Sequence, residues 1–104
     1  MSLNIQLPQT AEWGIRRIKA LIDLQDDTLT AGTLTVVNEI MVQCGTTIKL
    51  INKDADDAVW EACEKLRDTS TELFTHMART KQANTAGVQY EKFLEACKVF
   101  KEAC

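Results

Sequence analysis

Residues that could do chemistry are few in this 104-residue sequence, and His76 is the first among them. It is the only histidine, and Arg79 follows it by about one helical turn, so the guanidinium group would attract an anion held at the imidazole. Serine occurs only at positions 2 and 70, and the sequence contains no glycine-rich phosphate loop. His76, with Arg79 beside it, is therefore the one residue for which a chemical role can be suggested, and the sequence predicts no catalytic residue.

The His76–Arg79 pair resembles part of the phosphorylation motif of histidine phosphotransfer domains. Those domains are small four-helix bundles with an exposed histidine, a basic residue three positions later and a glycine at the fourth position. In this chain Thr80 stands where the glycine would be, and the histidine comes late in the sequence. The resemblance implies a signalling function by phosphotransfer, with His76 as the phosphoacceptor and Arg79 as its basic neighbour. The competing interpretation is a histidine at the rim of a helical core with no special task.

Cysteine, histidine and carboxylate spacing does not predict a metal site. The four cysteines, which form no CxxC pair, are Cys44, Cys63, Cys97 and Cys104. The acidic run at 54–57 lacks the glycine and the closing glutamate of a calcium loop, and the carboxylates within 61–68 have no second acidic helix motif to face. We therefore expect no metal and no cofactor, and we expect the cysteines to be buried as free thiols. Two disulfides in an oxidising compartment are the alternative.

Charge argues against a nucleic-acid partner. Fifteen acidic residues against twelve basic residues give a net charge of −3, and the densest basic run, at 16–19, is soon followed by three aspartates.

The sequence has no uncharged apolar run of about 18 residues, and its N-terminus lacks the basic and then apolar segments of a signal peptide. We expect a soluble, cytoplasmic protein with neither a nucleic-acid nor a membrane partner.

Helical spacing of apolar residues runs through the chain from residue 9 onward. It predicts helices at about 9–25, 28–51, 55–82 and 86–103, and their short connections make consecutive helices antiparallel neighbours. The predicted fold class is all-α, a single-domain up-down-up-down four-helix bundle over residues 9–104. Before it, Leu3, Ile5 and Leu7 alternate with polar residues, which predicts a short extended N-terminal arm at 1–8; an unstructured leader is the alternative.

The second predicted helix has residue types that favour a different structure. Threonine and β-branched residues prefer strands, and Cys44-Gly45 stands between two such runs as a hairpin turn would. A hairpin over 34–51 is therefore an alternative. It would separate polar from apolar side chains poorly, whereas a helix places Val37 and Ile40 on one stripe. We favour the helix.

The same stretch is unusually neutral, because only Glu39 and Lys49 carry charge between positions 28 and 51. A helix this neutral is covered on more than one side, by the chain's own helices or by another chain. We therefore predict a protein–protein interaction or self-assembly module that is not an enzyme, with a protein partner or a homodimer. The predicted interface residues are Thr35, Val42, Thr46 and Leu50.

Two alternative functions stay open at this point. One is phosphotransfer at His76, which the resemblance implies. The other is a small apolar ligand held between the helices by Trp13, Met41 and Trp60, because bundles place ligand sites among their helices. Sequence alone does not distinguish a filled core from a hollow one.

Overall fold

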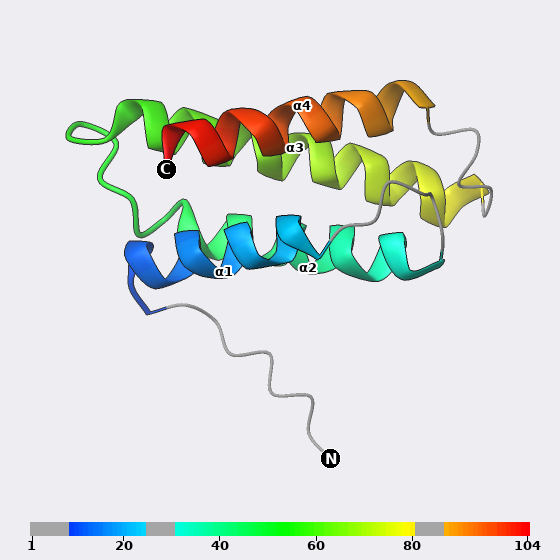
Figure 1. Ribbon diagram of the computed structural model, residues 1–104, viewed down its shortest axis with the longest axis horizontal. Helices are drawn as coiled ribbons and strands as arrows, with labels where there is room; N and C mark the ends of the chain where they lie inside the picture. The colour runs from blue at the N-terminus through cyan, green and yellow to red at the C-terminus, as the bar shows by residue number, and fades with distance from the viewer. Residues whose placement is uncertain (1–8, 25–30, 81–86) are drawn as a thin grey trace, which may run out of the picture.

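All four predicted helices are present in the computed structural model, which describes residues 9–24, 31–80 and 87–104 (Figure 1). They are α1 (Ala11–Asp23), α2 (Ala31–Thr47), α3 (Asp57–Thr80) and α4 (Gly87–Ala103). Successive helices run in opposite directions, and the closest packing joins α1 to α2, α2 to α3 and α3 to α4. The predicted all-α, up-down-up-down four-helix bundle is confirmed. The predicted arm at 1–8 lies outside the described residues.

The start of α1 is defined by a side-chain cap. Thr10 has an extended backbone, with φ −132° and ψ 153°, and its Oγ1 accepts a hydrogen bond of 3.1 Å from the backbone N of Trp13. This bond satisfies one of the N–H groups that a helix leaves unpaired at its first turn. The helix therefore begins at Ala11, two residues after the predicted start.

The second helix ends at Thr47, four residues earlier than predicted. The backbone N of Leu50 donates to the carbonyl of Thr47 at 2.9 Å, a tighter turn than that of an α-helix. Asn52 Oδ1 then accepts from the backbone N of Asp54 at 3.0 Å, and this bond turns the chain toward α3. Residues 31–47 are helical, so the hairpin interpretation is wrong. The apolar helical period outweighed the strand propensity of the threonines and valines.

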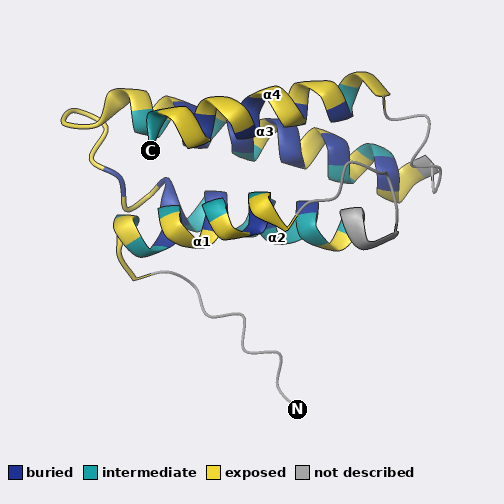
Figure 2. Ribbon diagram, viewed as in Figure 1, coloured by how far each residue is buried: buried dark blue, intermediate teal, exposed yellow. Residues whose placement is uncertain are grey.

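One continuous core fills the space between the helices (Figure 2). Its largest fully buried apolar side chains are Phe93, Phe100, Ile18, Ile40, Leu66, Leu73 and Val37. Two side-chain bridges tie α1 to the end of α4: Lys19 Nζ donates to the carbonyl of Cys104 at 2.9 Å, and Lys101 Nζ pairs with Asp23 Oδ1 at 2.7 Å. The core and these bridges hold the first and last helices in one unit.

Gly14 allows α1 to approach α2 closely. A Cβ placed on Gly14 would lie 2.8 Å from Cγ2 and 3.0 Å from Cβ of Thr47, and nearer still to its Oγ1. Thr47 is fully buried, and within the described residues its hydroxyl has no hydrogen-bond partner. The crossing of these two helices therefore depends on the missing side chain at position 14.

Candidate functional site

The outward face of α2 carries three of the four predicted interface residues. Thr35 is exposed, Val42 and Thr46 are half-buried, and their spacing of seven and four residues places them on one side of the helix. Leu50 is 41% exposed but lies in the turn beyond the end of α2. The predicted set is therefore divided between a helix face and the turn that follows it.

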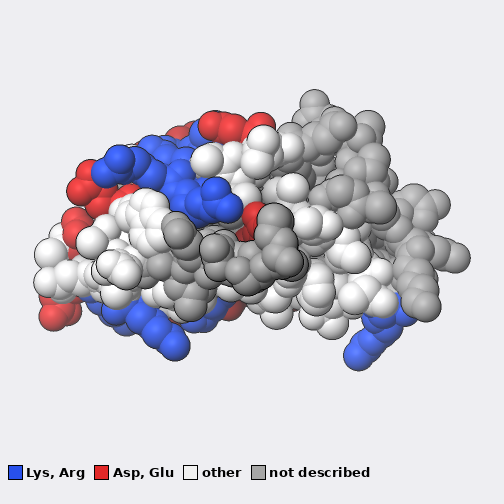
Figure 3. Space-filling model, turned by 90° about the horizontal axis from the view of Figure 1, so that it is seen from below, with Lys and Arg blue, Asp and Glu red and all other residues white. Residues whose placement is uncertain are grey.

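This face carries a single charged residue, Glu39, which follows Thr35 by one helical turn and whose side chain is also partly exposed to solvent. Glu39 extends toward α1, where its Oε2 lies 4.0 Å from Arg17 Nη2. Figure 3 looks onto the side of α1 and α2 and shows uncharged residues over much of this face, with most lysine and arginine side chains toward the left of the view. A partner that covers this face would therefore desolvate the Arg17–Glu39 pair and, beside it, mainly uncharged side chains.

Leu50 also lines a hollow at one end of the bundle, where the ends of α1, α3 and α4 meet the turn after α2. The hollow has a volume of about 720 Å³ and includes the apolar side chains of Ile15, Ile51 and Val59. Charged residues from α1 and from the start of α3 surround these apolar groups. No sequence pattern predicts this hollow, because its walls come from segments far apart in the chain.

The residues predicted to hold a small apolar ligand do not line that hollow. Trp13 and Met41 are half-buried on α1 and α2, and the ring of Trp60 is covered by Lys53, whose Nζ lies 4.3 Å from the ring centroid. A cation over an aromatic face is a common surface arrangement and needs no ligand. The ligand-binding alternative therefore gains no support from these three side chains.

His76 and Arg79 lie together on a second hollow, of about 370 Å³, between α3 and the start of α4. His76 is half-buried and Arg79 is exposed. Thr75 and Gln89 add polar side chains to this hollow, whereas the carboxylate of Glu72 opposes the binding of an anion there. The structure thus brings the predicted pair to one surface site.

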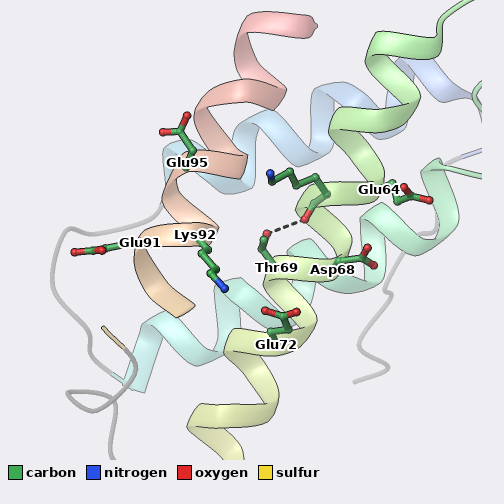
Figure 4. A pocket seen from close by; sticks show the side chains of 8 residues that line it. Glu64, Asp68, Thr69, Glu72, Glu91, Lys92 and Glu95 are labelled. Carbon is green, nitrogen blue, oxygen red and sulfur yellow. Dashed lines mark hydrogen bonds between the residues drawn. The ribbon is translucent and has the colours of Figure 1, made fainter. Parts of the chain in front are cut away.

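A third, acidic hollow of about 640 Å³ runs between α3 and α4 (Figure 4). It is lined by Glu64, Lys65, Asp68, Thr69, Glu72, Glu91, Lys92 and Glu95. Glu91 and Glu95 point away from Glu64 and Asp68, so the carboxylates diverge rather than converge (Figure 4). Consistently, no cluster of three or more metal-ligating side chains occurs in the described parts of the chain. Sequence reasoning missed the contribution of α4 to this acidic surface.

The four cysteines are free, and three of them are buried in the core, as predicted. Cys63 Sγ donates a hydrogen bond of 3.7 Å to the carbonyl of Cys44. A hydrogen bond between the two thiols raises the pKa of Cys44, assisted by burial, and lowers the pKa of Cys63, which is also near the positive charge of Arg67. Burial raises the pKa of Cys97 to about 12.

No protein-family model, curated protein or solved structure matches this chain. No helix in the described ranges is long and apolar enough to cross a membrane. The choice among the surfaces above therefore depends on their geometry and chemistry alone.

Proposed function

We propose that this protein is a helical module that binds another protein, or a second copy of itself, through the outward face of α2, without catalytic activity. The observation that supports this function is the weakly charged face on which Thr35, Val42 and Thr46 align around Glu39, its only charged residue, continued at its end by the exposed Leu50. Its free cysteines fit a reducing compartment, and we place the protein in the cytoplasm.

The favourable free energy of binding would come mainly from two apolar side chains, those of Val42 and Leu50. Val42 and Leu50 each retain surface that a partner can remove from water, at roughly 25 cal/mol for each Å² of apolar area. Thr35 and Thr46 add no charge that would have to be desolvated. Most of the binding energy of an interface comes from a few such residues, and their neighbours mainly exclude water.

The test compares two valines at different positions, the half-buried Val42 on α2 and the exposed Val99 on α4. Val42→Lys places a charge in the proposed interface, whereas Val99→Lys places the same charge on the outer surface of α4, where Val99 is 37% exposed. We expect Val42→Lys, and likewise Leu50→Lys, to reduce the mass in solution measured by light scattering at high protein concentration. Val99→Lys should behave as wild type, and circular dichroism should show equal helix content in all variants.

For a hetero-partner, the same variants are used as immobilised baits. Proteins bound by wild type and Val99→Lys but lost with Val42→Lys are those that use this face. If Val42→Lys leaves both the mass and every bound protein unchanged, the outward face of α2 is not an interface and the proposal is wrong.

A second candidate function is phosphotransfer at His76, and one observation favours it. His76 and Arg79 line the same hollow, together with the hydrogen-bonding side chains of Thr75 and Gln89. A phosphoryl group on the imidazole would meet the guanidinium group of Arg79. The test is incorporation of acid-labile phosphate from a small phosphodonor, with loss of the label in His76→Gln and a reduced rate in Arg79→Gln. Wild-type protein that takes up no phosphate would exclude this function.

A further inference from the structure

Two buried cysteines from neighbouring helices lie in contact inside the bundle. Cys44 on α2 and Cys63 on α3 are both fully buried, and Cys63 Sγ lies 3.7 Å from the carbonyl oxygen of Cys44. α2 and α3 pack directly against one another, and this packing places the Cys63 side chain against the Cys44 backbone, so these two cysteines are the candidates for a disulfide between the helices.

We propose that Cys44 and Cys63 form a reversible dithiol–disulfide pair that is oxidised by a small disulfide such as oxidised glutathione. In the first step the Cys63 thiolate attacks one sulfur of the oxidant, forms a mixed disulfide and releases one glutathione thiolate. In the second step Cys44 loses its proton to that thiolate, and its sulfur attacks Cys63 Sγ, which releases the second glutathione. Two protein thiols are oxidised while one small disulfide is reduced to two thiols.

The surroundings of the two sulfur atoms assign Cys63 as the attacking group. The hydrogen bond from Cys44 lowers the pKa of Cys63, and the charge of Arg67, one turn further along α3, acts in the same direction. Cys44 keeps its proton, because its pKa is raised by the same hydrogen bond and by burial. Burial makes the Cys97 thiol a poor nucleophile, with a pKa of about 12.

Access of the oxidant sets the rate of this reaction. Both sulfur atoms are fully covered, so glutathione reaches Cys63 only when α2 and α3 separate locally. Cys104 is half-buried at the end of the chain and should therefore form a mixed disulfide sooner than Cys63 does. Once formed, the Cys44–Cys63 bond joins α2 to α3 and encloses the turn that contains Leu50. This redox property is independent of the proposed binding function.

The experiment treats the native protein with oxidised glutathione, blocks the remaining thiols and digests the chain with trypsin without reduction. Each cysteine falls on its own tryptic peptide, namely 20–49 for Cys44, 54–65 for Cys63, 93–98 for Cys97 and 102–104 for Cys104. We expect peptides 20–49 and 54–65 to become the main linked pair, and dithiothreitol to separate them.

Variants assign the roles of the two thiols. Cys44→Ala should leave Cys63 as a glutathione mixed disulfide, because the second attack is lost, and Cys63→Ala should abolish the link. Cys97→Ala removes a buried thiol outside the pair and should retain the link. The proposal is overturned if wild type shows only mixed disulfides, if the main link joins another pair or two chains, or if Cys44 and Cys63 stay reduced after Cys104 has reacted.

Discussion

Replacement of Gly14 by alanine tests whether the close crossing of α1 and α2 is fixed by the absence of a side chain. The new Cβ would lie 2.8 Å from Cγ2 and 3.0 Å from Cβ of Thr47. Thr47 is β-branched and helical, so its side chain has little freedom to rotate away. The backbone of one helix must move instead, and the packed core resists that movement.

Two opposing effects determine the expected change in stability. Overpacking a buried contact costs about 1–3 kcal/mol, whereas alanine in place of glycine within a helix gains about 1 kcal/mol. Because the contact involves a rigid side chain rather than the end of a flexible one, we expect the cost of overpacking to lie in the upper part of its range, at about 2–3 kcal/mol. Gly14→Ala should therefore destabilise the fold by about 1–2 kcal/mol, with a fall in Tm of roughly 4–8 °C for each kcal/mol in a domain of this size.

Urea unfolding followed by circular dichroism measures this change, and Gly45→Ala is the matched control. Gly45 is also helical, but a Cβ there would meet nothing within 4 Å, so this variant should be stabilised by about 1 kcal/mol. The double variant Gly14→Ala/Thr47→Ala should recover most of the loss, since it removes Cγ2 and the Oγ1 hydroxyl, which is buried without a partner in the described structure, and leaves only the contact with Cβ at 3.0 Å. A Gly14→Ala variant as stable as Gly45→Ala would refute the reasoning.

Two further predictions concern the cap of α1 and the thiol of Cys97. Thr10→Ala removes the acceptor of the Trp13 N–H and should cost about 1 kcal/mol in urea unfolding, whereas Thr10→Ser should keep most of that stability. Burial raises the pKa of Cys97 from 9.0 to about 12, so the folded protein keeps a proton that the unfolded chain loses, and stability falls as pH rises from about 9 to about 12. Between about pH 8 and about pH 10, wild type should lose about 1.4 kcal/mol more than Cys97→Ala. Equal losses in the two proteins would contradict the burial of this thiol.

The fold was predictable because helical periodicity persists even where residue propensity opposes it. In α2 the strand-favouring residues suggested a hairpin, yet Val37, Ile40 and Cys44 recur at helical spacing and are all fully buried in the core. The ends of the helices were less predictable. The end of α2 at Thr47 depends on a tight backbone turn and on the side chain of Asn52, and neither has a periodic signature.

The surface sites were less predictable than the core, because they combine distant segments. Sequence spacing was enough to bring His76 and Arg79 together, since both lie on α3. It was not enough to bring Ile15 and Val59 to one hollow, nor Cys44 to Cys63, because such contacts depend on how neighbouring helices are rotated. The sequence predicts on which face of its helix each cysteine lies, but it does not predict which residue of a neighbouring helix that cysteine contacts.

The packing of α2 also sets how strongly the protein should associate with itself. Neighbouring helices α1 and α3 cover much of α2, which leaves Val42 and Leu50 as the apolar residues of the proposed interface. In a symmetric dimer the four side chains would contribute about 4–8 kcal/mol in total, because each is already partly covered. Loss of translational and rotational freedom costs about 4–15 kcal/mol, so the balance favours weak association. We therefore expect the mass from light scattering to fall to that of a monomer on dilution. A dimer that persists across a wide dilution series would mean that another surface, such as the hollow beside Leu50, contributes to the contact.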